Sequence, residues 1–199
     1  MPVEEDAARE VSDGPPTIVT ERLVLRAFRP ADVEPLFAIQ RDPVAMQHTF
    51  TAASRADSER FLAKYAALFP EHGFAPWTVV LRSEERVVAW GGISVDPFDP
   101  GWGIEIGYFV DARHWGRGIA SEIVSVSLRY GFTALGLAKI GAFTRPANAA
   151  SQRVLEKAGF RFRGYEPKIE RNRYAIARAD WRSRSAPAPS RAPGGRSGS

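Results

Sequence analysis

The chain has no cysteine among its 199 residues and only three histidines. Without cysteine there is no disulfide, no thiolate metal site and no cysteine nucleophile. His48 and His72 lack the spacing typical of a metal site, so no metal is predicted. No apolar run approaches the roughly 20 residues that cross a bilayer, so no membrane partner is expected. The N-terminus is acidic and lacks the apolar segment of a secretory signal, which predicts a cytoplasmic location.

Charge is unevenly distributed along the sequence, which has a formal net charge of +4. Residues 1–16 carry a net −4 and residues 182–199 a net +4, so the ends cancel and the body keeps the whole positive charge. A modestly basic body suits an anionic ligand such as a nucleotide cofactor. No continuous Lys/Arg stripe favours nucleic acid, and binding through the arginine-containing C-terminal end is kept only as a minor alternative.

Both ends have compositions typical of disorder: residues 1–16 are charged and small, and residues 183–199 contain only Ser, Arg, Ala, Pro and Gly. We therefore predict one domain over 17–182 between two disordered tails. Hydrophobic periodicity and turn residues predict strands at about 20–28, 76–82, 86–95, 103–110, 137–144, 160–166 and 172–179, and helices at about 30–40, 54–69, 117–133 and 148–158. This order predicts an α/β fold, with a mixed sheet and helices on both faces.

The most informative segment is residues 113–118 (RHWGRG), which lie between the apolar strand 103–110 and a long amphipathic helix. Glycines there allow a tight turn whose N–H groups converge at the positive end of the helix dipole. That arrangement favours a phosphate or pyrophosphate, although a turn with glycines for steric reasons alone is the alternative. A Walker loop is excluded because no Gly-Lys-Ser/Thr follows. Dinucleotide binding is disfavoured by Ser121 at the third small position and by the absence of an acid in 137–144.

Several motifs resemble those of one family. Arg113-x-x-Gly116-x-Gly118-x-Ala120 resembles the acyl-CoA pyrophosphate signature of the GCN5-related N-acetyltransferases (GNAT). Residues 148–160 (NAASQRVLEKAGF) look like the second signature block of that family. Residues 20–26 (TERLVLR) and 105–108 (EIGY) are similar to its RimJ/RimL-type branch. The resemblance covers about residues 18–181.

The resemblance implies a GNAT-like, mostly antiparallel sheet in which two parallel strands, 103–110 and 137–144, splay apart around acetyl-CoA, the co-substrate. Backbone at Phe109 and Val110 would pair with the pantetheine arm and the acetyl carbonyl, and N–H groups from the turn would hold the pyrophosphate. The predicted cofactor-binding residues are Phe109, Val110, Arg113, His114, Trp115, Gly116, Arg117, Gly118, Ile119, Ala120, Asn148 and Ser151.

The implied activity is direct acetyl transfer from CoA to a primary amine, on a protein N-terminus or on a small molecule such as an amino sugar. The acceptor pocket is predicted from the helices in 28–75 and the loop 96–102. A homodimer is left open. A non-catalytic acyl-CoA-binding module is the alternative of a different class.

Glu105 is the predicted general base, because it is a carboxylate in an otherwise apolar strand (GIEIG), where burial raises its pKa. The alternative is a structural carboxylate paired with an arginine. Asn148 is expected to cap the helix that follows and to approach the pantetheine, and Ser151 to hydrogen-bond the leaving thiolate. Leu155 occupies the position where the family often has a tyrosine that acts as the general acid, so the identity of the proton donor is left open. Strand alternation sends Tyr108 to the face opposite Glu105.

Overall fold

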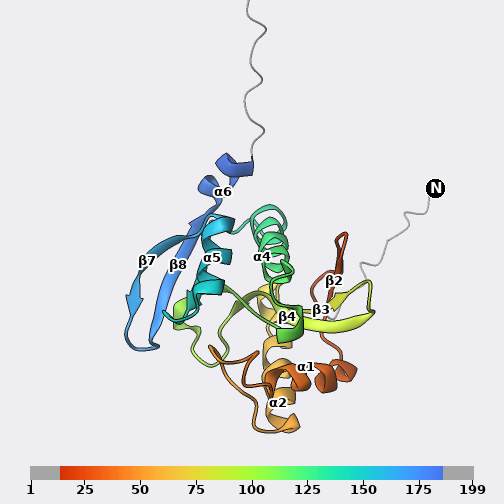
Figure 1. Ribbon diagram of the computed structural model, residues 1–199. Helices are drawn as coiled ribbons and strands as arrows, with labels where there is room; N and C mark the ends of the chain where they lie inside the picture. The colour runs from red at the N-terminus through yellow and green to blue at the C-terminus, as the bar shows by residue number, and fades with distance from the viewer. Residues whose placement is uncertain (1–13, 186–199) are drawn as a thin grey trace, which may run out of the picture.

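The structure, a computed structural model, describes residues 14–185 (Figure 1). Its strands are β1 (Ile18–Val19), β2 (Leu23–Arg26), β3 (Trp77–Leu81), β4 (Arg86–Val95), β5 (Ile104–Val110), β6 (Lys139–Thr144), β7 (Arg161–Glu166) and β8 (Arg171–Ala177). Its helices are α1 (Val33–Gln40), α2 (Arg55–Ala66), α3 (Phe69–His72), α4 (Ile119–Arg129), α5 (Ala149–Ala158) and α6 (Arg178–Ser185).

The strands form one mixed sheet in the order β1-β2-β3-β4-β5-β6-β8-β7. Neighbouring strands are antiparallel except β5 and β6, which are parallel. This parallel pair is joined at a single position, Glu105 opposite Gly141. The predicted α/β class and the splayed parallel pair are therefore confirmed.

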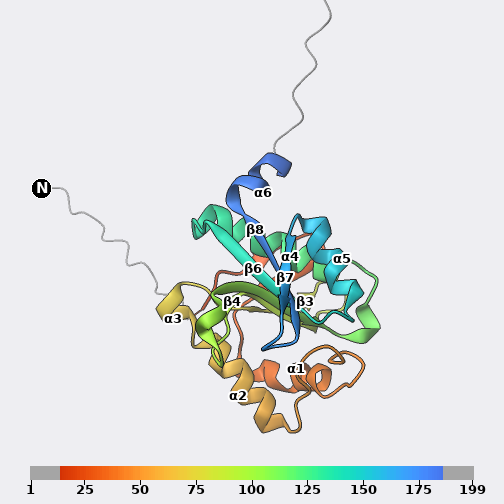
Figure 2. The same cartoon turned by 90° about the vertical axis from the view of Figure 1, so that its left-hand side faces the viewer.

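Helices cover both faces of the sheet: α4 and α5 lie on one side, and α1 and α2 on the other (Figures 1 and 2). On the first side, Val124, Leu128 and Leu155 pack on Ile106 and Ile140 of the strands. On the other, apolar side chains of α1 and α2 pack against Trp90 and Phe109. Fully burying one such side chain contributes roughly 1.5–3 kcal/mol, so the helices hold the splayed strands firmly in place.

The structure differs from the predicted boundaries at both ends of the domain. Residues 14–16, expected in the N-terminal tail, contact the body, where the indole Nε1 of Trp77 donates to the carbonyl of Pro16 at 3.0 Å. At the other end, α6 reaches Ser185, beyond the predicted boundary at 182. The rest of both predicted tails lies outside the described residues. Among residues 14–185, no helix is long and apolar enough to cross a membrane.

Two predicted helices are divided. The segment 54–69 forms α2 and then the separate short α3, in which Pro70 occupies the first turn. Proline has no backbone N–H to donate inside a continuing helix, but it is tolerated in the first turn of a new one. The segment 117–133 ends as α-helix at Arg129 and continues as one π-helical turn, Tyr130–Ala134.

Candidate active site

The edge of β5 that faces β6 is open toward its C-terminal end, because the two strands are joined only at Glu105 and Gly141. The amide of Asp111 donates to the carbonyl of Val88 at 2.9 Å, which makes Asp111 and Val88 a hydrogen-bonded pair. Hydrogen-bonded pairs alternate along antiparallel strands. Phe109 therefore pairs with Trp90 of β4, whereas the backbone groups of Tyr108 and Val110 face the open edge.

This geometry corrects the expectation for Phe109, whose backbone is engaged with β4. Its ring instead stacks on Trp90, with centroids 5.3 Å apart. The backbone groups available to an extended ligand belong to Tyr108 and Val110. The carbonyl of Val110 already accepts from the indole Nε1 of Trp115 at 2.9 Å, which leaves its N–H for a ligand.

The glycine turn follows β5 and leads into α4. Gly116 has a φ of 74° and Gly118 a φ of 79°, in the left-handed region that glycine adopts without strain. In the described part of the chain, the backbone N–H groups of residues 116–120 make no backbone hydrogen bond outside α4. These amides meet at the N-terminus of α4, where unpaired donors and the helix dipole favour an anion.

Two predicted anion ligands do not fit this role through their amides. His114 and Trp115 donate to the carbonyls of Asp111 and Ala112 in a short 3₁₀ turn, at 2.9 and 3.2 Å. The His114 ring is buried, with Nε2 3.2 Å from a carboxylate oxygen of Glu84. Arg113 is paired with Asp111, so its charge is partly neutralised. The amides that can hold an anion therefore begin at Gly116.

Arg22 of the β1–β2 turn was not predicted as a site residue, yet it fixes the glycine turn. Its Nη1 donates to the carbonyl of Arg117 at 2.6 Å, and its guanidinium pairs with Glu122 in the first turn of α4. Thr20 also hydrogen-bonds that carboxylate. The carboxylate of Glu122 is thereby occupied and kept from the anion-binding amides.

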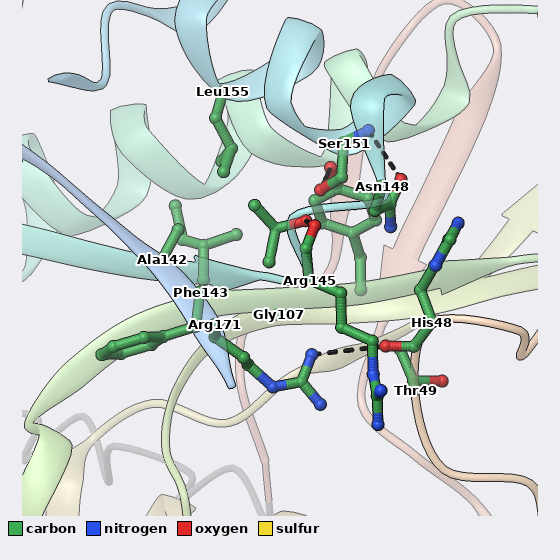
Figure 3. A pocket seen from close by; sticks show the side chains of 13 residues that line it. His48, Thr49, Gly107, Ala142, Phe143, Arg145, Asn148, Ser151, Leu155 and Arg171 are labelled. Atoms are coloured by element: carbon green, nitrogen blue, oxygen red, sulfur yellow. Dashed lines mark hydrogen bonds between the residues drawn. The ribbon is translucent and has the colours of Figure 1, made fainter. Parts of the chain in front are cut away.

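On the α5 side of the open edge, the hydroxyl oxygens of Tyr108 and Ser151 lie 2.9 Å apart. The amide of Ser151 donates to the side-chain oxygen of Asn148 at 3.0 Å, so Asn148 caps α5 as expected. All three line one pocket, together with the buried Leu155 (Figure 3). Burial raises the pKa of Tyr108, which keeps the phenol protonated as a donor.

Glu105 lies on the opposite face of β5, the face it shares with Phe109 and with α1 and α2. It does not line the pocket of Figure 3. Burial, reinforced by the negative charge of Asp96 and opposed by Arg171, raises the pKa of Glu105 to about 7. Among residues 14–185, no ion pair within 4 Å engages its carboxylate, and Arg171 acts on it from a greater distance. No group of three or more metal-ligating side chains occurs in this part of the chain.

The family described as acetyltransferase (GNAT) domain matches residues 22–161, a span that includes the open edge, the glycine turn and α5. The chain belongs to the GNAT family.

Relatives of this GNAT enzyme support the assignment. This chain is 33% identical over 151 residues to the uncharacterized N-acetyltransferase YoaA of Bacillus subtilis, and the match covers 75% of this chain and 85% of that protein. A GNAT-family acetyltransferase structure from Bacillus anthracis superposes with a TM-score of 0.66 at 28% identity, covering 82% of this chain and 99% of that one. The ribosomal-protein-S5-alanine acetyltransferase of Vibrio fischeri shares the fold, with a TM-score of 0.68 at 22% identity over 83% and 98% of the two chains. These similarities favour an enzyme over a non-catalytic acyl-CoA-binding module.

Two features of this GNAT site had weak signals in the sequence. Alternation correctly places Tyr108 on the face opposite Glu105, but only the fold brings α5 onto that face. The sequence around Arg171 predicts only a strand and carries no functional motif. The place of Arg171 in the pocket depends on the register of β8 against β6. The predicted Asn148 and Ser151 do come together with Tyr108.

Proposed function

We propose that this GNAT enzyme takes acetyl-CoA as donor and transfers its acetyl group directly to a primary amine, as enzymes of the RimJ/RimL-type branch do. The observation that carries the proposal is the open edge of β5, which runs from the Tyr108–Ser151 pair to the free amides of the glycine turn. A thioester acyl donor supplies an activated carbonyl. In this account, the amides of residues 116–120 bind the pyrophosphate, and backbone groups of Tyr108 and Val110 pair with the pantetheine.

Glu105 acts as the general base. An ammonium ion cannot attack a carbonyl carbon, so a proton must first leave the amine. A carboxylate with a pKa of about 7 accepts that proton, directly or through one water, and passes it to solvent. An α-amine of pKa near 8 gives it up at a cost of about 1.4 kcal/mol, whereas a lysine amine of pKa about 10.4 costs more than about 4 kcal/mol. The magnitudes favour an α-amine over a lysine side chain as acceptor.

Ser151 and Tyr108 supply the proton that the departing sulfur needs. As the nitrogen–carbon bond forms, the carbon–sulfur bond breaks and leaves a thiolate. The hydroxyl of Ser151, hydrogen-bonded to the phenol of Tyr108, donates to that sulfur, and the phenol restores the serine proton. The second proton, which the nitrogen releases as the amide forms, returns through solvent to the phenolate. Together they take the role of the tyrosine that Leu155 replaces.

Calorimetric titration with acetyl-CoA, CoA and NADPH tests the donor. We expect acetyl-CoA and CoA to bind with micromolar affinity and NADPH to give no heat. If none of the three binds, the glycine turn is only a turn and the proposed function fails. A cytoplasmic location and a homodimer stay predictions.

A further inference from the structure

Two arginines line the pocket in Figure 3: Arg145, which directly follows β6, and Arg171, the first residue of β8. Thr144 of β6 pairs with Asn172 of β8, so the next residues, Arg145 and Arg171, lie opposite one another. Arg171 is half-buried, and Arg145 is exposed at the rim. Both line the same pocket as Tyr108 and Ser151.

Neither arginine forms an ion pair in the described part of the chain. Among residues 14–185, no carboxylate oxygen lies within 4 Å of either guanidinium. The one hydrogen bond of the Arg171 side chain runs to the backbone carbonyl of His48, at 3.3 Å. Burial, and then the charge of Arg145, lower the pKa of Arg171, and the more distant charges of Glu105 and Asp96 only partly oppose this. Like charges held side by side in a partly buried site are unfavourable, and a bound anion would relieve the repulsion.

Both arginines are on the same face of the sheet as Glu105. Ile140 and Ala142 of β6 are buried beneath α5, as are Tyr174 and Ile176 of β8. Alternation therefore turns the side chains of Arg145 and Arg171 to the other face, which is the face of Glu105. Asp96, on the loop after β4, adds a second negative charge near Arg171.

This face of the sheet carries charges of both signs: Arg145 and Arg171 line the pocket, and the acids Glu105 and Asp96 lie outside its lining but within electrostatic reach of Arg171. Acids attract an ammonium group, and arginines bind a carboxylate with charge-assisted, often bidentate hydrogen bonds. A ligand with an amine and a carboxylate a few bonds apart matches both. The α-amine of a protein N-terminus lacks this match, because the carbonyl beside it is part of a neutral amide.

We propose that the acceptor is a small primary amine that carries a carboxylate, namely a free amino acid. Arg145 and Arg171 bind the carboxylate and direct the amine toward Glu105. The assignment rests on the proposed acetyl transfer and narrows its acceptor. The two arginines are not needed for the pyrophosphate of CoA, which the amides of residues 116–120 at the start of α4 bind in the proposed function.

The test compares acceptors that differ only in the carboxylate. The protein amino acids other than proline and cysteine, their carboxamides and their decarboxylated amines are each incubated with the enzyme and saturating acetyl-CoA, and release of free thiol is followed. For at least one amino acid, we expect kcat/KM to exceed that of its carboxamide and its amine by tenfold or more. A ratio of this size corresponds to the free energy of one charge-assisted hydrogen bond.

Arginine variants locate the effect. R145Q and R171Q should raise KM for the preferred amino acid at least tenfold, with a much smaller rise in KM for its carboxamide. R171K should retain part of the preference, because it keeps the charge but not the fork of donors. R173Q is the matched control, since Arg173 is an exposed arginine of β8 that does not line the pocket. R145Q keeps the test valid if R171Q unfolds the segment around His48.

The outcomes separate the two proposals. Equal or better use of carboxamides, amines or a peptide with a free N-terminus would overturn the amino-acid acceptor and leave acetyl transfer intact. The same holds if R145Q and R171Q leave the preference unchanged. Absence of transfer to every amine and peptide would overturn acetyl transfer itself, and the acceptor assignment with it.

Discussion

The phenolic oxygen of Tyr108 lies 2.9 Å from the hydroxyl oxygen of Ser151, so a hydrogen bond joins the open edge of β5 to the first turn of α5. Glu105, three residues earlier on the same strand, faces the opposite side of the sheet. The proposed proton acceptor therefore lies on one face of the strand, and the two proposed proton donors, Tyr108 and Ser151 of α5, lie on the other. An acetyl transfer needs both, because the amine loses a proton and the leaving sulfur gains one.

Removing either hydroxyl of this pair should slow the chemical step. We expect Tyr108→Phe and Ser151→Ala each to lower kcat by about tenfold to a hundredfold, with little change in acetyl-CoA affinity. The double variant should lose little more than either single one, because the two hydroxyls act as a unit. Tyr130→Phe is the control, since its hydroxyl contacts the carbonyl of Gly73. Unchanged kcat in both single variants would rule the pair out as proton donor.

The base should be visible in the pH dependence of the rate. Glu105 accepts a proton only when it is ionised, so its contribution rises as pH increases through its pKa of about 7. Glu105→Gln should lower kcat/KM by about 10²–10⁴ above that pH. The ratio of wild-type to variant kcat/KM cancels the titration of the amine itself and should rise with pH and level off.

Two further variants check this assignment. Asp96→Asn should move the midpoint of that ratio to lower pH, because the repulsion that raises the pKa is removed. Exposed Glu21 provides the control, and Glu21→Gln should leave the profile unchanged. A wild-type profile that Glu105→Gln does not alter would exclude Glu105 as the base.

The glycine turn can be tested with two glycines of matched backbone. Gly116 has a φ of 74° and Gly136 a φ of 66°, and a Cβ on either would meet nothing within 4 Å. Gly116→Glu and Gly136→Glu should therefore suffer similar strain, about 1–2 kcal/mol. Only the first adds a negative charge at the anion-binding amides, and we expect calorimetry to show at least tenfold weaker acetyl-CoA binding for it alone. Equal affinities would contradict the pyrophosphate site.

The sequence was most informative where local chemistry decides the structure. The glycines at 116 and 118, the cap at Asn148 and the apolar strand around Glu105 could all be read from neighbouring residues. Properties that depend on pairing between distant strands could not. Which backbone groups of β5 face the open edge depends on the hydrogen bond of Asp111 to Val88, and this decided against Phe109. The proximity of Arg145 and Arg171 likewise depends on the register of β6 with β8.

The N-terminal part of the domain depends on a buried ion pair. Asp32 accepts hydrogen bonds from both terminal nitrogens of Arg26, at 2.6 and 2.7 Å, and from Thr78 at 3.0 Å. Although burial opposes ionisation, these bonds lower the pKa of Asp32 overall. The ionised carboxylate of Asp32 therefore stabilises the fold fully above the unfolded-state pKa of about 3.9. This stabilisation is lost as pH falls through the lower pKa of the folded state.

Asp32→Asn should lower the free energy of unfolding at pH 7 by about 3 kcal/mol, because it leaves Arg26 buried without its partner. Denaturant unfolding measures the change. The exposed pair of Arg55 and Glu59 is the control, and Glu59→Gln should cost at most about 0.5 kcal/mol. The difference between wild type and Asp32→Asn should shrink at acid pH. If the loss of unfolding free energy in Asp32→Asn does not depend on pH, the negative charge of Asp32 is not the source of the stabilisation.

The most direct test of the account is to detect both products of one turnover. The enzyme is incubated with acetyl-CoA and the amine panel, free thiol is titrated, and acetylated amine is quantified by mass spectrometry. We expect one acetylated amine for each CoA thiol released, at a rate that Glu105→Gln lowers by at least a hundredfold. Thiol release without any acetylated amine, or a Glu105→Gln variant as fast as wild type, would contradict it.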